Sequence, residues 1–343
     1  MTVTAPRPNS MDSVPRELVV ALRRLGLAGP TEDVRGIPLT GGVSSDVWRA
    51  ELSTGPVCLK RALPKLKVAA DWHAPTARAQ WEARWLEMSG QVLPPSILRA
   101  FDDETGVLVL EWLEPGRYPV WKDLLIEGHV DADFAAAVGC SLARLHAAGA
   151  REDLDDWNAA RPLFEALRIT PYFRSTAQRN PEYAALLAEA VASLERAAVT
   201  VVHGDVSPKN ILAGHAGPVF LDAECASPGD PAFDVAFCLN HLLLKAVWLP
   251  GRRGALDAAA TALFEAYLEA VDWEASDGLA RRVLAFLPAL ALARVDGMSP
   301  VEYFDEENGR PAVRVAAVDL LKSPARSIDE HTARWATLTS TNG

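Results

Sequence analysis

Acidic and amide side chains gather in two neighbouring segments of this chain, each beginning with an apolar, strand-like run. The segments are VVHGDVSPKNILAG and VFLDAECASPGDPAFDVAF, and their polar residues are His203, Asp205, Lys209, Asn210, Asp222, Glu224, Asp230 and Asp234. Two interpretations are open: these residues form polar turns, or they form a site that holds a cation and moves a proton. An isolated Asp in a polar loop is more often a turn or cap residue, so only the combination favours a site.

The order of Asp205, Asn210 and Asp222 suits the chemistry of phosphoryl transfer. An acceptor hydroxyl needs a carboxylate that can take its proton, and Asp205 lies in a suitable loop. Magnesium prefers oxygen ligands, typically one or two protein groups together with phosphates and waters. Asn210 can supply an amide oxygen from the other end of a short loop, and Asp222 can supply a carboxylate at the end of VFLD.

The chain of 343 residues changes its pattern near Pro115. Before that point, strand-like pieces separated by turn residues (GIPLTGG, VSSDVWRAEL, GPVCLKRAL, ILRAFDDETGVLVLEWL) surround one helical stretch at 74–88. Apolar residues at 3.6-residue spacing then predict mostly helices, with TVVHGD and PVFLDAE as two isolated strand-like runs. We expect an N-terminal lobe at 1–114, of which 1–30 is an extension with a helix at 17–27, and a helical C-terminal lobe at 115–343.

The motifs HGDxxxxN, LDxE and GDPxxD, in this order and on this layout, resemble the aminoglycoside phosphotransferase and choline kinase branch of the protein-kinase-like fold. The resemblance covers roughly residues 35–300. It implies an α+β, two-lobed fold with a small antiparallel sheet plus helix in the first lobe and a large, mainly helical second lobe. It also implies an ATP- and Mg²⁺-dependent O-phosphotransferase that acts on a small polar acceptor such as an aminoglycoside, an amino alcohol or a sugar.

The resemblance gives the loop residues their roles. It makes Asp205 the catalytic base and Asn210 and Asp222 the metal ligands, with Glu224 supporting a second metal or its waters. His203 and Asp234 are then structural: the ring of His203 holds the catalytic loop, and Asp234 accepts hydrogen bonds from backbone N–H groups of that loop. Two further residues have no assigned role in catalysis. Lys209 either reaches the transferred phosphate or is a solvated loop lysine, and Asp230 is expected to form a turn.

The first lobe contains the parts that would bind a nucleotide. The candidates are Gly41 and Gly42, where backbone can approach phosphates, Ser44 and Ser45 as phosphate donors, Lys60, Glu82, and Glu111 at the expected hinge, acting through its backbone. Lys60 lies mid-strand among apolar residues, and the resemblance makes it the lysine that binds the α- and β-phosphates. Its expected ion-pair partner is Glu82, with Glu87 in reserve. The alternatives are a plain GG hairpin and a surface lysine on an edge strand.

The acceptor is expected to be small, because only a few residues separate Asp222 from the turn at Gly229, which leaves no room for the activation segment of protein kinases. Candidate acceptor-side pieces are LRITPYFR (167–174) and ARVDGMSPVEYF (293–304), the latter with Arg294 and Asp296. The alternative is that GMSP simply ends one helix and starts another. The acidic balance of the chain, together with Asp296, Glu302 and Asp305, favours a cationic or polyhydroxylated acceptor.

A net charge of −11 and a pI near 5.2 disfavour nonspecific binding to nucleic acid or to anionic membranes, and the oligomeric state is open. The N-terminus lacks a secretory h-region and the four cysteines have apolar neighbours, so we expect a cytoplasmic protein with buried, reduced thiols.

Two other classes of protein compete with the kinase interpretation. A catalytically silent kinase-like binding protein would typically lack the lysine, the base or the metal-binding Asp, all of which are present. A metal-dependent hydrolase would leave Lys60 unexplained.

Overall fold

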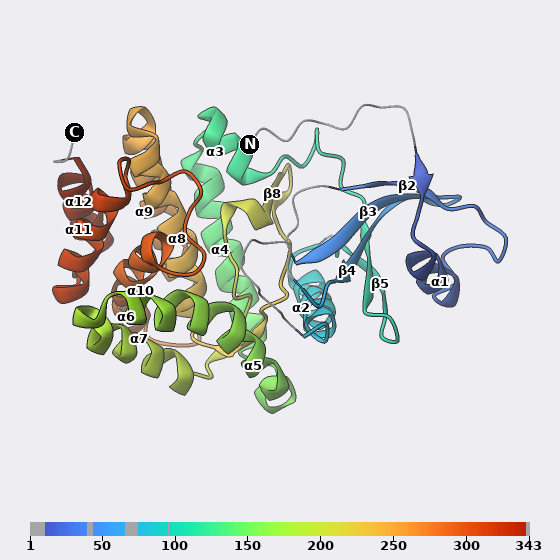
Figure 1. Cartoon of the computed structure of the whole chain (residues 1–343), viewed down its shortest axis with the longest axis horizontal. Helices are drawn as coiled ribbons and strands as arrows, with labels where there is room; N and C mark the ends of the chain where they lie inside the picture. The colour runs from blue at the N-terminus through green and yellow to red at the C-terminus, as the bar shows by residue number, and fades with distance from the viewer. Residues whose placement is uncertain (1–10, 40–43, 66–74, 95, 341–343) are drawn as a thin grey trace. The chain divides into compact units, whose positions relative to one another are not determined.

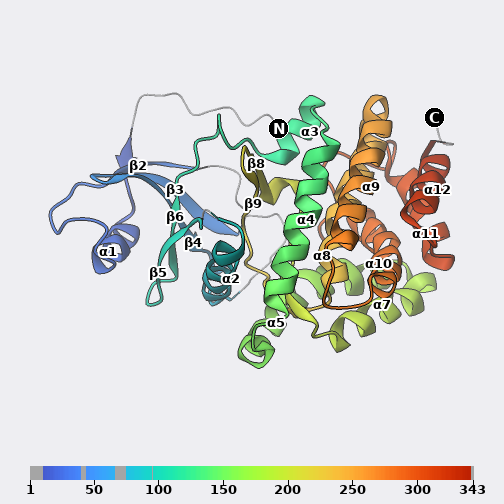
Figure 2. The same cartoon turned by 180° about the vertical axis from the view of Figure 1, so that it is seen from behind.

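The computed structural model describes residues 11–39, 44–65, 75–94 and 96–340. The chain divides into two compact units, Met1–Glu114 and Pro115–Gly343, which we call the N-terminal unit and the C-terminal unit. The N-terminal unit contains an antiparallel sheet and two helices, and the C-terminal unit is mainly helical (Figures 1 and 2). The α+β class predicted from the sequence is therefore confirmed.

The sheet of the N-terminal unit has six strands in the order β1-β2-β3-β4-β6-β5, and every neighbouring pair is antiparallel. The strands are β1 (Asp12–Ser13), β2 (Arg35–Pro38), β3 (Ser45–Leu52), β4 (Gly55–Ala62), β5 (Leu98–Asp102) and β6 (Val107–Glu111). Buried apolar residues alternate along β3 and β4. In β6 the four consecutive apolar residues from Val107 to Leu110 are buried, as expected for a strand with both faces covered.

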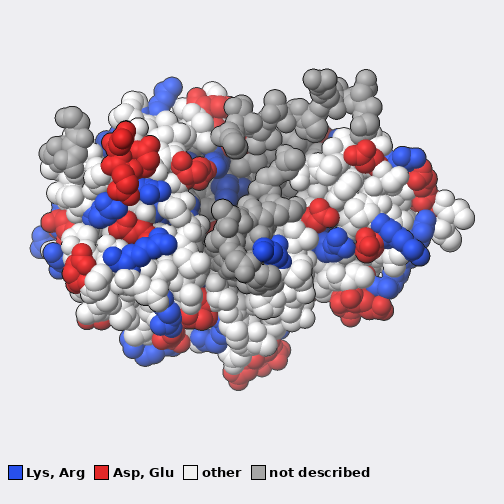
Figure 3. Space-filling view, in the orientation of Figure 1, with Lys and Arg blue, Asp and Glu red and all other residues white. Residues whose placement is uncertain are grey.

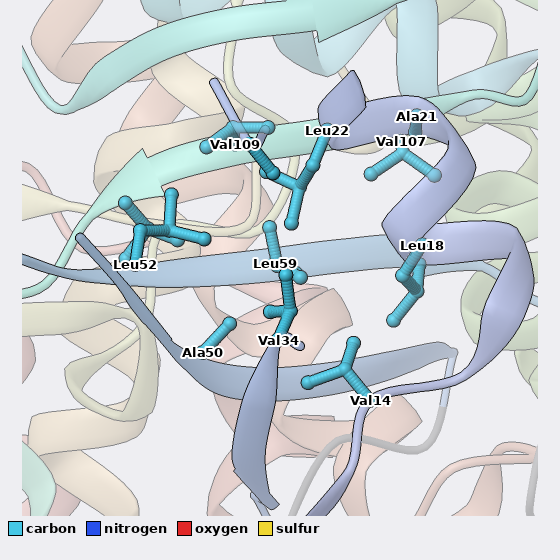
Figure 4. Close-up of a cluster of buried hydrophobic side chains, with 12 residues drawn as sticks. Val14, Leu18, Ala21, Leu22, Val34, Ala50, Leu52, Leu59, Val107 and Val109 are labelled. Carbon is cyan, nitrogen blue, oxygen red and sulfur yellow. The ribbon is translucent and has the colours of Figure 1, made fainter. Parts of the chain in front are cut away.

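Helix α1 (Arg16–Arg24) covers one face of this sheet. Its apolar residues Leu18, Ala21 and Leu22 are spaced to lie on one side of the helix and are fully buried. Figure 4 shows them against side chains of the three central strands, which are Ala50, Leu52, Leu59, Val107 and Val109. The helix expected at 17–27 thus contributes to the core of the N-terminal unit.

Helix α2 (Arg78–Val92) contacts β4, β5 and β6. Side chains alternate between the two faces of a strand, so Lys60 points away from the face that carries Leu59 and α1. Lys60 meets Glu82 of α2, which places α2 on the face opposite to α1. The two helices cover the two sides of the same sheet.

The C-terminal unit is a set of packed helices with two small two-stranded sheets. Its α-helices are α3 (Trp121–Glu127), α4 (Ala132–Gly149), α5 (Arg161–Phe164), α6 (Ser175–Arg179), α7 (Ala184–Arg196), α8 (Pro231–Trp248), α9 (Arg253–Glu269), α10 (Ser276–Asp296), α11 (Arg310–Lys322) and α12 (Ile328–Ser340). Five further helical segments are η1 (Leu154–Ala160), η2 (Glu165–Arg174), η3 (Pro181–Tyr183), η4 (Pro208–Asn210) and η5 (Pro250–Arg252). The strands are β7 (Thr200–Val202), β8 (Ile211–Gly214), β9 (Gly217–Phe220) and β10 (Ser227–Gly229).

Helix α8 is the central helix of this unit. It packs against α4, α9, α10 and α12, and its residues from Pro231 to Ala246 are buried. The helix begins at Asp230, whose carboxylate accepts a hydrogen bond from the N–H of Ala232 at 3.0 Å and pairs with Arg282 at 2.8 Å. Asp230 is therefore a helix cap, which refines the turn role expected for it.

Two local expectations differ from the structure. Cys140 is exposed and Cys58 is half-buried, so the expectation of buried thiols holds only for Cys225 and Cys238; all four cysteines are free. LRITPYFR forms most of η2, a π-helical segment that no periodicity of apolar residues announces. Within the described residues, no single helix has the length and apolar character needed to cross a membrane, although the bent pair Pro231–Trp248 and Pro250–Glu269 together meets that test.

Candidate active site

A short loop between β7 and β8 carries His203, Asp205 and Asn210, and a hairpin then returns the chain to the same place. In the β8–β9 hairpin, Ile211 pairs with Phe220, and the N–H of Leu221 donates to the carbonyl of Asn210 at 2.8 Å. The residues just outside the hairpin are therefore held side by side. This register explains how Asn210 and Asp222, twelve positions apart in the sequence numbering, flank one point of the unit.

Asp205 is a buried carboxylate with three donors on one of its two oxygens. Its Oδ2 lies 3.1 Å from Arg168 Nη2, 3.1 Å from Lys209 Nζ and 2.8 Å from Asn210 Nδ2. No hydrogen bond from a described residue reaches its Oδ1. The side chain is thus fixed in place by one oxygen while the other remains open to a ligand.

The charges around Asp205 keep it ionised. Burial alone would raise the pKa of Asp205, but Arg168 and Lys209 outweigh that effect and hold the pKa below its usual value. Burial alone would lower the pKa of Arg168, but Asp205 and the other acidic groups around it together outweigh burial and raise that pKa. Asp205 is therefore a carboxylate at any physiological pH.

Arg168 is the functional candidate that the sequence reasoning missed. Besides Asp205, it donates from Nε to the carbonyl of Gly204, and from Nη1 to the carbonyl of Leu167 at 2.6 Å. It lies in η2, and π-helical segments are frequent at functional sites. The segment 167–174 had been named as an acceptor-side piece, but nothing in the sequence distinguishes Arg168 from Arg174, which forms surface ion pairs.

His203 and Asp234 hold the loop from behind, in the way that was expected of them. Both carboxylate oxygens of Asp234 accept backbone N–H groups, from His203 at 2.6 Å and from Gly204 at 2.8 Å. The ring of His203 accepts the N–H of Asp205 on Nδ1 at 3.1 Å and donates from Nε2 to the carbonyl of Leu221 at 3.0 Å. These roles require a neutral imidazole, and burial lowers the pKa of His203 accordingly.

Asp222 adopts a left-handed backbone conformation, with φ of 67°, and is the one non-glycine residue of the described chain to do so. Such strain in a non-glycine residue persists where the surroundings enforce it, and Asp tolerates it better than most residues. Glu224, two residues later, is buried with 8% exposure.

The donor set fits a divalent cation that also binds phosphates. Asn210 uses its amide N–H₂ group on Asp205, and within the described residues its amide oxygen accepts no hydrogen bond. No group of three or more His, Cys, Asp or Glu side chains able to hold a metal occurs in the described part of the chain. A closed protein cage is thus lacking there, whereas one amide oxygen and one carboxylate are the ligand number typical of magnesium bound with a nucleotide.

In the N-terminal unit, Lys60 and Glu82 form the predicted ion pair. Lys60 Nζ lies 2.7 Å from both Glu82 Oε1 and Oε2, and both side chains are less than one tenth exposed. The charge of Lys60 is therefore balanced and its ammonium is oriented by α2. An edge-strand surface lysine, the alternative interpretation, is wrong, because β4 lies between β3 and β6.

The other nucleotide candidates are only partly covered by the structure. Gly41 and Gly42 lie outside the described residues. Ser44 and Ser45 are buried where β3 begins, and the carbonyl of Ser44 accepts a hydrogen bond from Arg78 at 2.6 Å. Glu111 ends β6, with its carboxylate bound by Arg99 at 2.6 Å. Its backbone N–H donates to the carbonyl of Ile97 at 2.7 Å, so this N–H is not available for the expected role.

Arg294 and Asp296 lie at the end of α10 and face different partners. Arg294 is buried and donates to the carbonyl and the hydroxyl of Ser299, with the Oγ at 3.0 Å. Asp296 is bound by Arg314 at 2.7 Å. The helix ends here, as the alternative interpretation of GMSP required, and the charge of Asp296 is already neutralised.

Solved structures of low sequence identity share this fold. A Plasmodium vivax ethanolamine kinase is 14% identical, with 93% of this chain and 86% of that chain covered and a TM-score of 0.54. An amicoumacin kinase is 14% identical, with 90% and 94% covered and a TM-score of 0.55. An aminoglycoside phosphotransferase from Alicyclobacillus acidocaldarius is 17% identical, with 97% and 98% covered and a TM-score of 0.50. No curated protein matches the sequence.

A six-stranded sheet unit with a buried Lys–Glu pair, and a helical unit with this loop, define a phosphotransferase of the kinase-like class. The profile of the Phosphotransferase enzyme family matches residues 35–279, and the chain belongs to this family. The chain is therefore a phosphotransferase, as the sequence predicted.

Proposed function

We propose that this protein transfers the γ-phosphoryl group of ATP, in a Mg²⁺-dependent reaction, to a hydroxyl of a small polar acceptor, with Asp205 as the catalytic base. The observation that carries the proposal is the arrangement at Asp205, where three donors fix Oδ2 and leave Oδ1 open. A hydroxyl that donates to Oδ1 would be held in one orientation, and it would lose its proton to the same oxygen.

Phosphoryl transfer exchanges one bond to phosphorus for another. The acceptor oxygen forms a bond to the γ-phosphorus, and the bond from that phosphorus to the β–γ bridging oxygen breaks, so that its electron pair leaves with ADP. The acceptor proton goes to Asp205. The lowered pKa of Asp205 makes it a weak base, which suits a loose transition state in which the proton moves late and orientation contributes most.

Lys209 and Arg168 place two positive charges beside this carboxylate. The side chain of Lys209 is half exposed, so it can turn to the transferred phosphoryl group. Arg168 is buried by contrast and keeps Asp205 in position. We assign Lys209 to charge neutralisation and Arg168 to positioning.

Asn210 and Asp222 would hold the metal, through the amide oxygen and the carboxylate, with Glu224 near its waters. When bound, the ion neutralises the phosphate charge and orients the β- and γ-phosphates. The solved amicoumacin kinase contains AMP-PNP and Ca²⁺, which supports nucleotide binding with a divalent ion. Lys60, oriented by Glu82, would bind the α- and β-phosphates.

The test compares two variants of equal size. Asp205→Asn removes the base but keeps the loop hydrogen bonding, so kcat should fall by about 10²- to 10⁴-fold while Mg²⁺-ATP binding survives. Asp222→Asn should impair both. ADP release is measured with a panel of hydroxylated metabolites and antibiotics, and nucleotide affinity is measured by calorimetry.

Asp329→Asn, which removes an exposed carboxylate of the same unit, is the matched control and should keep full activity. Full activity in Asp205→Asn would exclude Asp205 as the catalytic base. If Mg²⁺-ATP binds but no compound yields phosphorylated product, the competing interpretation of a silent binding protein is favoured.

A further inference from the structure

Cations gather in the C-terminal unit at a place that the phosphoryl-transfer chemistry does not use. They are Lys122 of α3, Lys245 of α8 and Arg294 of α10, and we call them the basic cluster. Three observations show that they lie close together. Lys122 pairs with Glu302 at 3.0 Å, and the ring centroid of the next residue, Tyr303, lies 5.8 Å from Lys245 Nζ. The charges of Lys122 and Arg294 both act on Lys245.

The basic cluster is poorly balanced by acids. Lys245 is 2% exposed and Arg294 is 8% exposed, yet in the described part of the chain neither forms an ion pair with a carboxylate. Glu302 is occupied by Lys122 and is itself 68% exposed. Burying a cation without a partner is costly, so two such residues in one place indicate that something else supplies the negative charge.

Buried donors of the same region also lack partners. The Nε of Arg294 and the hydroxyl of Tyr303 are inaccessible to solvent and make no hydrogen bond to any residue that the structure describes. Buried polar groups normally find partners, so each exception needs an explanation, and a ligand that accepts hydrogen bonds is one of them. A hydrogen-bond acceptor with negative charge would satisfy these donors and the cations together.

One face of α8 connects the basic cluster to the catalytic loop. Asp234, Phe237, His241 and Lys245 follow at helical spacing, so they lie on one side. Asp234 binds the loop backbone. The ring centroid of Phe237 lies 5.7 Å from the guanidinium carbon of Arg168 and 5.2 Å from the ring centroid of His241. Phe237 and Lys245 are eight residues apart in the sequence numbering, which corresponds to about 12 Å along the helix.

Tyr172 provides a second connection. Its ring lies 5.8 Å from the guanidinium of Arg168 and 5.7 Å from that of Arg294. Arg168 is the residue that holds Asp205. The catalytic carboxylate and the basic cluster are thus connected by one continuous set of contacts.

The ionisation of the residues agrees with this geometry. Burial, together with the charges of Lys122 and Arg294, lowers the pKa of Lys245 to about 7, although Glu302 acts against them. An anion beside Lys245 would restore its charge. Burial and the surrounding cations hold the pKa of His241 well below its usual value, so His241 is a neutral hydrogen-bonding group rather than another cation.

The acids that had favoured a cationic acceptor are already used. Asp296 is bound by Arg314, Glu302 by Lys122, and the carboxylate of Asp305 accepts the N–H of Glu307 at 3.0 Å. Two of these three acids are thus paired with cations of the chain, so they no longer favour a cationic acceptor.

We propose that the acceptor of this phosphotransferase is a hydroxylated small molecule that carries an anionic group, a carboxylate or a phosphate, and that the basic cluster binds this group while the hydroxyl lies at Asp205. The proposal rests on the proposed function for the hydroxyl end. The binding of the anionic group is supported by the burial of Lys245 and Arg294 and by the unpartnered donors of Arg294 and Tyr303.

The experiment uses pairs of compounds that differ in charge but share their hydroxyl groups. The pairs are gluconate and sorbitol, glycerate and glycerol, and glucose 6-phosphate and glucose, and ethanolamine and glucosamine represent cations. Binding to the whole protein is measured by calorimetry with Mg²⁺-AMP-PNP at saturation, so that the nucleotide's own site does not capture the probe. Carboxylate and phosphate pairs are compared to separate the two kinds of anion.

We expect at least one anionic member to bind at least about tenfold more tightly than its neutral partner. Lys245→Met should abolish this preference, and Lys245→Arg, which keeps the charge, should retain it. Lys322→Met is the matched control, because Lys322 also lies over a tyrosine ring, that of Tyr183 at 5.2 Å, but is exposed. If Lys245→Met does not fold, Arg294→Gln replaces it.

Three results would overturn the proposal: tighter binding of neutral or cationic members, binding of no anionic member, or an unchanged preference in a folded Lys245→Met protein. Mass spectrometry of mixtures with Mg²⁺-ATP tests the proposed function separately. An anionic probe that binds through Lys245 but is never phosphorylated would count against the proposed function and leave the anion site standing.

Discussion

Lys60 and Glu82 form a buried pair in which each charge is the other's partner. Removing one member of such a pair typically costs about 3–5 kcal/mol, because the other charge is left buried and alone. A simple Lys60→Ala variant would thus mix a loss of nucleotide binding with a loss of stability. The pair has to be replaced as a unit.

We therefore predict the behaviour of the double variant Lys60→Met, Glu82→Gln. It should fold with near-normal stability, because no unpaired charge remains. Its melting temperature should rise much less with millimolar Mg²⁺-ATP than that of the wild type, because the phosphates lose a fixed cation. Differential scanning fluorimetry with and without nucleotide measures this. An undiminished shift would show that Lys60 does not bind phosphate.

At the scale of residues, motifs could be predicted and isolated side chains could not. Lys60, Glu82, His203 and Asp234 were placed correctly, because their positions in recurring motifs identify their contacts. Arg168 was missed, because a single arginine in a helical segment looks the same whether it pairs with Asp205 or with solvent. Only the packed structure distinguishes the two cases.

At the scale of elements, α8 carries a buried lysine in its apolar interior, and this lowers stability in a pH-dependent way. The pKa of Lys245 falls from 10.5 in the unfolded chain to about 7 in the fold. Between these values the unfolded chain binds more protons, so the free energy of unfolding rises with pH. The cost of burying Lys245 is complete below about pH 7 and disappears above its unfolded pKa.

We predict that Lys245→Met increases the free energy of unfolding at about pH 6 and that the increase is much smaller at about pH 9.5. Urea denaturation at both pH values measures it, with Lys322→Met as a control that should show no such difference. Lys122, Arg294, Glu302 and Cys238 also act on Lys245, but they are present in both proteins compared. An equal effect at both pH values would mean that Lys245 is charged throughout.

Short elements show where the sequence signal ends. β7 and β9 were expected from TVVHGD and PVFLDAE, whereas β8 and β10, of four and three residues, were not. All four strands have only three or four residues, too few for an alternating pattern, so length does not separate the two that were expected from the two that were not. β10 contains a proline and a glycine, and it exists because it pairs with β7. Tertiary contacts decide such segments.

At the scale of the whole molecule, the protein combines a strongly negative total charge with a positive interior cluster. The chain has 45 acidic and 34 basic residues, and Figure 3 shows both signs interspersed over the face that it draws. An anionic acceptor is therefore repelled at long range and attracted only at close range. Salt screens the first effect far more than the second, because buried charges are poorly screened.

We predict that kcat/KM for an anionic acceptor, at saturating Mg²⁺-ATP, does not fall as ionic strength rises from about 0.01 M to about 0.1 M. Steady-state kinetics over this range, with the neutral member of the pair as reference, checks the expectation. A steep fall would mean that surface charges, rather than the basic cluster, attract the acceptor.

Helix α8 is one uninterrupted helix of 18 residues, and its two ends have different duties. Asp234 near its start holds the backbone of the loop that carries Asp205. Lys245, about 16 Å further along, belongs to the basic cluster that we propose to bind the acceptor. Substitutions near Lys245 can thus accumulate during evolution without disturbing the contacts of Asp234. We expect acceptor preference to diverge among descendants of such a chain by replacements around 241 and 245, while the reaction itself is passed on unchanged.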